Sequence, residues 1–127
     1  MKVLVVDDSP TMRRMVKNVL VQLGHTDVLE AEDGIQALQL LEMHAVDLLI
    51  IDWNMPGING IEVVRRLRQK SRYQSLPVIM ISIRDNRDDV LQAAQAQVSG
   101  YLLKPFSPTV LQKKIEQVLA AHKAETN

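Results

Sequence analysis

The sequence predicts an α/β domain in which a parallel sheet of five strands lies between two layers of helices, a three-layer doubly wound arrangement. Short apolar runs alternate with longer segments of helical periodicity, and five such pairs follow one another along the chain. Three of the short runs are apolar on successive residues, which is typical of strands buried on both faces. The joints are short, which favours parallel strands connected by right-handed crossovers.

Five segments are candidate strands, and each precedes a helical segment. They comprise residues 2–7, 27–32, 47–52, 77–82 and 101–104. The first, third and fourth are continuous apolar runs, as a fully buried parallel strand requires. The segment 27–32 instead alternates and carries glutamates, so we expect it at an edge of the sheet.

The first helix is expected to begin with Ser9 as its N-cap and Pro10 as its first residue. Its apolar residues recur at intervals of three and four, at positions 12, 15, 16, 19, 20 and 23. Gly24 follows the last of them, where a glycine commonly ends a helix.

The later helices carry weaker versions of the same pattern. The second is marked by Ile35, Leu38, Leu41 and Ala45, and the third by Ile61, Val64 and Leu67. The fourth lies near residues 88–99, and its expected inward residues are Val90, Leu91, Ala94 and Val98. The fifth opens at Ser107 and Pro108 and continues with Val110, Leu111, Ile115, Val118 and Leu119.

Length and composition limit the possible classes of protein. The 127 residues suffice for one domain, which we expect over residues 1–122, followed by a polar tail over residues 123–127. The chain has no cysteine, which excludes disulfides and thiolate metal sites, and its net charge of zero argues against a nucleic-acid partner. No run approaches the ~20 apolar residues that span a membrane. We expect a cytoplasmic monomer without membrane insertion.

Polar residues gather at the ends of four of the five candidate strands. Asp7 and Asp8 end the first, Asp52 the third, Ser82 the fourth and Lys104 the fifth. In open parallel sheets, ligands bind at the carboxyl ends of strands where the strand order reverses. If the first and third strands are neighbours, the three aspartates converge, and such a cluster requires a cation. The ligands are all oxygens, which favours Mg²⁺ over Zn²⁺.

Each of these residues also has an ordinary structural role to be weighed. Asp8 is a plausible helix cap, and Asp52 and Ser82 are common turn or cap residues. A lone lysine at a strand end, such as Lys104, is usually solvated, and Tyr101 within an apolar run usually packs in a core or at an edge. The coincidence of polar residues at four strand ends favours a functional site.

Four motifs together resemble the receiver domain of two-component response regulators. They are the acidic pair in "VVDDS", the aspartate in "IIDWNMPG", the hydroxyl in "VIMIS" and the lysine and proline in "KPF". The resemblance extends from Lys2 to about Ala121 and implies a flavodoxin-like (βα)5 fold with strand order 2-1-3-4-5, an order that we take from the resemblance. Within the family, "DWNMPG" and a tyrosine three residues before Lys104 are most similar to the single-domain chemotaxis regulators.

The resemblance assigns a metal site and a phosphoryl acceptor. Asp52 is implied as the acceptor of the phosphoryl group. Asp8 is implied as a direct Mg²⁺ ligand, Asp7 as a ligand through water, and Asn54 as a donor of its main-chain carbonyl. The chemistry agrees, because a carboxylate is ionised at neutral pH and attacks phosphorus without a general base. The acidic pair then serves to hold the cation beside the acceptor.

The same resemblance assigns a switch. Ser82 is implied to bond the phosphoryl group and Lys104 to pair with it, and the Lys104–Pro105 peptide is expected to be cis. A new phosphoryl group carries about two negative charges. Ser82 is expected to move toward it and Tyr101 to turn inward, altering the face formed by the fourth helix, the fifth strand and the fifth helix. This is a shift between two packings of one fold.

These assignments predict a stand-alone response regulator that is no enzyme beyond self-phosphorylation from small donors and its own dephosphorylation. Its expected partners are a histidine kinase or histidine phosphotransfer protein, and a downstream target such as a motor-switch protein or another signalling protein. A phosphate shuttle or sink and a phosphorylation-independent interaction module remain alternatives.

Two other classes of protein fit the sequence less well. A hydrolase of the haloacid dehalogenase kind needs an acid two residues after its nucleophile, where this chain has Ser9 after Asp7. A flavodoxin-like cofactor binder needs a glycine-containing phosphate loop, and "DDSPT" has none.

One residue departs from the family pattern. Ile83 follows Ser82 where the family usually has a small residue, so we expect it to slow the entry of small phosphodonors or the attack of water. Arg84 and Asn54 are also expected near an attacking water. A basic run over residues 65–72 is expected to be a solvated helix face, with a kinase-docking role as the minor alternative, and Arg13 and Arg14 are further docking candidates.

Overall fold

The computed structural model describes residues 1–126, with side chains to residue 125. The strands are β1 (Lys2–Val6), β2 (Asp27–Ala31), β3 (Leu48–Asp52), β4 (Val78–Ser82) and β5 (Gly100–Leu103). The helices are α1 (Pro10–Gln22), α2 (Gly34–Met43), α3 (Gly60–Arg68), α4 (Arg87–Gln95) and α5 (Pro108–Thr126), with a short 3₁₀ turn over Ser71–Tyr73.

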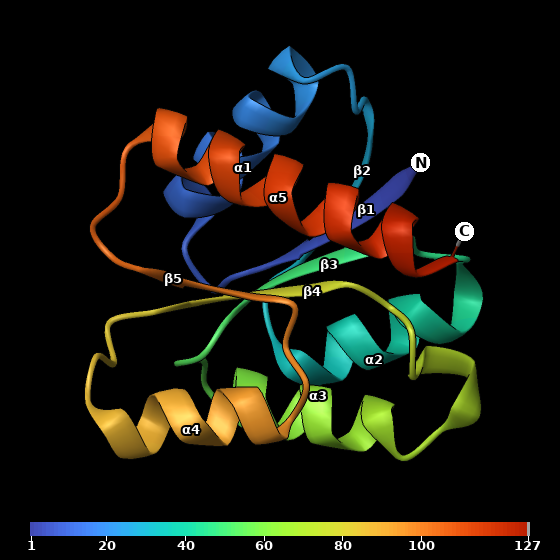
Figure 1. Cartoon of the computed structure of the whole chain (residues 1–127), viewed down its shortest axis with the longest axis vertical. Helices are drawn as coiled ribbons and strands as arrows, with labels where there is room; N and C mark the ends of the chain where they lie inside the picture. Colours follow the sequence, from blue (N-terminus) through green and yellow to red (C-terminus); the bar gives the residue numbers. More distant parts are fainter. Residues whose placement is uncertain (127) are drawn as a thin grey trace.

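All five strands are parallel and lie in the order β2-β1-β3-β4-β5, which confirms the expected order. The helices α1 and α5 cover one face of the sheet, and α2, α3 and α4 cover the other (Figure 1). The glutamate-bearing strand β2 lies at one edge, as its alternating pattern predicts, and β5 lies at the other. The strand order reverses between β1 and β3, so the carboxyl ends of these two strands mark the expected ligand position.

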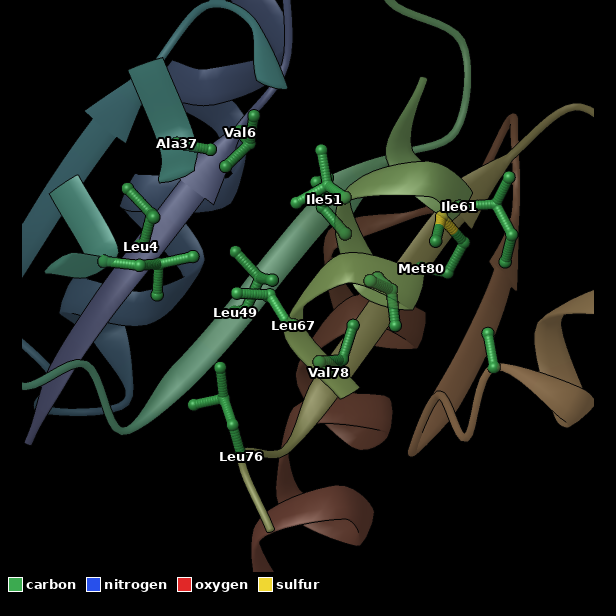
Figure 2. Packing of buried hydrophobic residues seen from close by; sticks show 14 of the residues in the cluster. Leu4, Val6, Ala37, Leu49, Ile51, Ile61, Leu67, Leu76, Val78 and Met80 are labelled. Atoms are coloured by element: carbon green, nitrogen blue, oxygen red, sulfur yellow. The ribbon is translucent and has the colours of Figure 1, made fainter. Parts of the chain in front are cut away.

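Side chains on the two faces of the sheet build two separate cores. Along β1, Leu4 and Val6 pack toward α2 and α3, whereas Val3 and Val5 pack toward α1 and α5. Figure 2 shows the first of these cores, where strand residues from β1, β3 and β4 meet Ala37, Ile61 and Leu67. The central strands β3 and β4 are buried along their whole length, which explains why their sequences are apolar on successive residues.

Helix starts follow the signals in the sequence. The Ser9 side chain accepts a hydrogen bond from the Met12 amide at 3.2 Å, and Pro10 is the first residue of α1, as predicted. Asp33, Asn59 and Asn86 cap α2, α3 and α4 in the same way. Such side chains satisfy amide groups that a helix leaves without partners at its start.

The structure corrects the predicted inward face of α4. Its buried residue is Ala93, and Ala96 at its C-cap is also buried, whereas Val90, Leu91 and Ala94 are exposed and only Val98 packs partly against the core. The larger apolar residues drew the prediction, but the residues of this segment that are buried in the core are the small Ala93 and Ala96. The larger apolar residues of α4, Val90 and Leu91, therefore face outward.

Three smaller details also differ from the sequence-based expectations. Ile35 of α2 is exposed, and the buried side of that helix is formed by Ala37 and Leu41. Val110 of α5 is exposed, while Leu111, Ile115 and Val118 are buried as expected. The expected tail at residues 123–126 continues α5, and Asn127 lies outside the described residues. The domain boundary at residue 122 stays a prediction.

The two ends of the described chain lie at the same end of the sheet. Met1 and His122 line one hollow of about 610 Å³ at the amino ends of the strands. The polar strand ends lie at the opposite, carboxyl end (Figure 1). Among residues 1–126, no helix is both long enough and apolar enough to cross a bilayer.

Candidate phosphoryl-acceptor and metal site

The sheet register brings the predicted site residues to one rim. Val6 is paired with Ile51, so Asp7 and Asp8 leave β1 beside Asp52, the last residue of β3. Asp52 is paired with Ile81 of β4, which places Ser82 one step further along the next strand. Ser82 is paired with Leu103 of β5, and Lys104 follows directly. Four strands thus deliver polar side chains to the same edge.

Three carboxylates form a compact cluster at this rim. Asp7, Asp8 and Asp52 each offer an oxygen within 4.8 Å of the others. Asp7 and Asp52 are buried, and Asp8 is exposed. One oxygen of Asp7, Oδ1, accepts a hydrogen bond from the Ser9 amide at 2.9 Å. Its Oδ2 is buried and accepts no hydrogen bond from any residue that the structure describes.

Lys104 is the cation that faces the two buried carboxylates. Its Nζ lies 3.2 Å from Asp52 Oδ1 and 3.6 Å from Asp7 Oδ2. Its amide donates to the main-chain carbonyl of Ser82 at 2.8 Å, which ties the start of the β5–α5 loop to β4. The Lys104–Pro105 peptide is cis, as the resemblance implies. One lysine balances only part of the charge of three carboxylates.

The raised pKa values of the two buried aspartates reflect this imbalance of charge. Burial, reinforced by the charge of Asp7, raises the pKa of Asp52 to about 6, although Lys104 opposes the shift. Burial likewise raises the pKa of Asp7, against the hydrogen bond from the Ser9 amide and the charge of Lys104. Asp52 is still mostly ionised at neutral pH. A second cation would lower both pKa values.

The donor set fits a hard divalent ion. Its ligands are carboxylate oxygens, one of which is buried without a hydrogen bond, and neither histidine nor cysteine belongs to the cluster. Mg²⁺ is typically held by one or two carboxylates and keeps several waters. The exposed position of Asp8 leaves the cluster open to water on one side. Asp7, Asp8 and Asp52 are therefore the residues that would hold Mg²⁺.

Ser82 is fully buried at the end of β4, and its hydroxyl already has one partner. Its Oγ accepts a hydrogen bond from the Arg84 amide at 2.9 Å. A hydroxyl can accept and donate at the same time, so Ser82 can also donate a hydrogen bond to an anion near Asp52. The next residue, Ile83, is 66% exposed.

A bridge made by Arg84 crosses between the loops that follow β3 and β4. Its Nη2 donates to Asn54 Oδ1 at 3.1 Å, its Nη1 lies 3.3 Å from Asp89 Oδ2, and its guanidinium lies 5.2 Å from the centre of the Trp53 ring. Its main-chain carbonyl accepts a hydrogen bond from the Tyr101 hydroxyl. Sequence analysis placed Asn54 and Arg84 near the site but missed Asp89 and this bridge.

Trp53 and Tyr101 are the two aromatic residues that contact Arg84. Trp53 is buried, and its ring meets that of Tyr101 edge to face with 6.4 Å between the ring centres. Tyr101 therefore already points toward the β4–α4 loop in this structure. The inward turn predicted for it on phosphorylation stays a prediction.

Gly60 is a further residue that sequence analysis missed. Its amide donates to the Trp53 carbonyl at 2.8 Å, which folds the β3–α3 loop back onto the end of β3. A Cβ at this position would overlap the main-chain carbonyl of Asp52. The glycine following Asn59 in "GINGIE" is the signal that could have indicated this close approach.

The basic run over residues 65–72 is used largely within the protein. Arg66 pairs with Glu62, Lys70 lies near Glu42, and Arg65 donates to Gln92. Arg68 donates to the carbonyls of Tyr73 and Gln97, and Arg72 lies over the Tyr73 ring. These contacts join α3 and its exit to α2 and α4, which favours the structural interpretation over kinase docking.

A doubly wound α/β domain with an acidic cluster, a lysine and a buried hydroxyl at its switch point defines the receiver class of signalling protein. Comparison with known families agrees, because residues 3–116 match the response regulator receiver domain family. The chain belongs to this family, which confirms the resemblance seen in the sequence.

Individual relatives are similar over nearly the whole chain. The identity is 48% over 126 residues with the chemotaxis protein CheY homolog of Campylobacter jejuni subsp. jejuni, covering 98% of this chain and 97% of the relative. It is 48% over 123 residues with CheY1 of Helicobacter pylori, covering 96% and 99%. The crystallised CheY4 of Vibrio cholerae has a TM-score of 0.85 and 35% identity, with 92% of this chain and 97% of that chain covered.

Proposed function

We propose that this protein is a phosphorylation-controlled response regulator in which Asp52 accepts a phosphoryl group in the presence of Mg²⁺. The observation that carries the proposal is the meeting of three carboxylates, Lys104 and Ser82 at the carboxyl ends of four strands. The phosphodonor would be a phosphohistidine of a histidine kinase or histidine phosphotransfer protein, or a small acyl phosphate.

The arrangement supports an in-line transfer to a carboxylate. A carboxylate oxygen of Asp52 forms a bond to phosphorus while the bond between phosphorus and the leaving group breaks. When acetyl phosphate is the donor, the leaving group is acetate. Asp7, Asp8 and Asp52, with the proposed aid of the Asn54 carbonyl, would hold Mg²⁺, which would supply positive charge for the phosphoryl oxygens. Lys104 already lies 3.2 Å from Asp52 and would pair with the phosphoryl group.

The proposed switch depends on the loop between β4 and α4. The Ser82 hydroxyl would donate to the new phosphoryl group and draw this loop toward Asp52. The loop is tied to Tyr101 through the Arg84 carbonyl and to α4 through the pair of Arg84 and Asp89. Movement of Ser82 would therefore shift both Tyr101 and the start of α4.

Exposed large apolar residues occur on each of the three elements that such a movement would reach, α4, β5 and α5. We define the exposed apolar patch as Val90 and Leu91 of α4, Leu103 of β5 and Val110 of α5, all of which are exposed large apolar residues. Apolar side chains gathered on a surface are a common mark of a protein interface. We propose that the target protein binds this patch and that phosphorylation changes its affinity.

The relatives' names favour a role in chemotaxis, and we propose a flagellar motor component as the target. The first experiment incubates the protein with Mg²⁺ and acetyl phosphate and records its intact mass. A gain of one phosphoryl group is expected, and Asp52→Asn should abolish it. No gain in the unsubstituted protein would contradict the proposal.

A second experiment identifies the target. Binding of a motor-switch peptide that rises on phosphorylation supports chemotaxis, whereas transfer to a histidine phosphotransfer protein alone supports the shuttle alternative.

A further inference from the structure

Arg13 of α1 is attached to the main chain at the acidic cluster. Its Nη1 donates to the main-chain carbonyl oxygen of Asp7 at 2.6 Å, and its Nε donates to Glu30 Oε1 at 3.1 Å. Only 16% of its side chain is exposed. The neighbouring Arg14 is an exposed residue of the same helix. The guanidinium of Arg13 thus links α1 to the end of β1 and to β2.

The carbonyl that Arg13 binds belongs to the peptide unit between Asp7 and Asp8. A peptide unit is planar, so fixing its carbonyl also fixes its N–H and the direction in which the chain enters Asp8. The flanking groups are held separately: the Asp7 amide donates to the Ala31 carbonyl at 3.1 Å, and the Ser9 amide donates to Asp7 Oδ1. Arg13 supplies the bond that orients the unit between the two acids.

Glu30 anchors the guanidinium from the other side. It lies on β2 opposite Val5 of β1, one pair before the strand end. Lys17 of α1 also lies 4.0 Å from its second carboxylate oxygen. The fork of an arginine can donate to two acceptors at once in a fixed geometry, which the single ammonium of a lysine does less well. The position of Arg13 is therefore set by the sheet as well as by its own helix.

We propose that Arg13 is a positioning residue for the magnesium site, because it orients the peptide unit that sets how the carboxylates of Asp7 and Asp8 face the cation. This inference rests on the proposed function, since it assumes that the cluster binds Mg²⁺. Charge alone predicts the opposite effect: Arg13 is a cation, and its removal should make the site more attractive to Mg²⁺. The sign of the change in affinity therefore separates positioning from charge.

The test is a titration of the metal-free protein with Mg²⁺, in which binding is monitored by the fluorescence of Trp53. This residue is the only tryptophan of the chain and a neighbour of Asp52. Arg13→Met keeps an unbranched apolar stem of similar shape and removes the guanidinium with every donor. Arg14→Met removes the same charge from the next residue and serves as the matched control. Arg13→Lys keeps the charge and one donor group. Urea unfolding without Mg²⁺ shows whether the substitutions alter stability.

The expected result is a loss of about 10-fold in Mg²⁺ affinity for Arg13→Met, a typical size for residues that orient metal ligands. Arg14→Met should leave the affinity unchanged or raise it, and Arg13→Lys should recover part of the loss. If Arg13→Met does not fold, Arg13→Gln carries the same expectation. Unchanged or tighter binding after loss of the Arg13 guanidinium would overturn this inference alone. No binding by the unsubstituted protein would overturn the proposed metal site and this inference with it.

Discussion

The hydroxyl of Tyr101 donates a hydrogen bond of 2.6 Å to the main-chain carbonyl oxygen of Arg84, which joins β5 to the loop after β4. The bond connects β5, which carries Leu103 of the exposed apolar patch, to the loop that follows Ser82. The Arg84 side chain continues the connection to Asn54 and Asp89. A movement at Ser82 therefore has a short covalent and hydrogen-bonded route to the patch.

We expect Tyr101→Phe to weaken the coupling between Asp52 and the patch. The protein should still be phosphorylated, but the rise in target affinity on phosphorylation should be smaller. The reason is that the hydrogen bond from Tyr101 to the β4–α4 loop is lost. Loss of one hydrogen bond should lower the free energy of unfolding by about 1 kcal/mol. Isothermal titration with a motor-switch peptide, before and after phosphorylation, measures the effect.

Tyr73→Phe is the matched control for this experiment. The Tyr73 hydroxyl also donates to a main-chain carbonyl, that of Leu41 at 3.0 Å, but it lies in the hollow at the other end of the sheet. Tyr73→Phe should lower the free energy of unfolding by a similar amount and leave the effect of phosphorylation on target affinity unchanged. Equal behaviour of the two variants in the binding assay would show that Tyr101 has no special role.

Stability of the metal-free protein should depend on pH through Asp52. The folded pKa of about 6 lies above the ordinary value of 3.8, so the folded state holds the proton more tightly than the unfolded state. This contribution is fully present below the unfolded pKa and is lost as the pH rises through the folded pKa. The shift corresponds to roughly 3 kcal/mol at most.

Asp52→Asn removes this titration and should stabilise the metal-free protein near pH 7 more than near pH 4. Urea unfolding at both pH values in the presence of a chelator measures the difference. Addition of Mg²⁺ should reduce the difference at neutral pH, because the bound ion replaces the proton as the partner of the carboxylates. A difference that does not change between the two pH values would contradict this explanation.

Gly60→Ala should disturb the acceptor directly. The added Cβ overlaps the carbonyl of Asp52 at the end of a buried strand, so the loop or the strand must move. We expect a loss of roughly 1–3 kcal/mol in the free energy of unfolding, as for other overpacked positions, and slower phosphorylation of Asp52.

Gly57→Ala separates backbone strain from overlap. Gly57 has a φ of +79°, but no atom lies within 4 Å of a Cβ placed there. Its substitution should lower stability by roughly 1–2 kcal/mol through the left-handed backbone alone and leave the phosphorylation rate close to normal. Normal phosphorylation of a folded Gly60→Ala protein would exclude the proposed displacement of Asp52.

Ile83→Ala should open the mouth of the site. Ile83 follows the buried Ser82 and is exposed at the rim, so its removal should raise several-fold the rate of phosphorylation by acetyl phosphate or the rate of dephosphorylation by water. Time courses of intact mass measure both rates. Leu91→Ala, which trims an exposed apolar residue of α4, should leave both unchanged. Unaltered rates in Ile83→Ala would contradict the expectation that Ile83 slows the entry of phosphodonors or the attack of water.

The sequence predicts the strands and the acidic rim well, because both depend on local patterns. Continuous apolar runs identify buried strands such as β3 and β4, and residues that end parallel strands share a rim whatever their exact side-chain conformations. The inward face of α4 was mispredicted, because the residues buried in the core are Ala93 and Ala96 rather than the larger Val90 and Leu91. Composition does not indicate which face of a weakly amphipathic helix is closer to its neighbours.

Long side chains limit prediction in a different way. Arg13 and Arg84 each span several ångströms from the main chain, and their partners come from other elements of the fold. Their positions in the sequence suggest proximity to the acids, but the choice between solvent, a docking partner and an internal carbonyl depends on geometry. The same holds for the basic run over residues 65–72, whose internal contacts depend on how α3 packs against α2 and α4.

Met1 and His122 border the same hollow at the amino end of the sheet, remote from the aspartates. A fluorophore or an affinity handle attached at Met1 or at His122 would consequently leave the acceptor rim unobstructed. Single-molecule observation of the protein while it exchanges phosphate with a donor is therefore practical with a label at this end of the sheet.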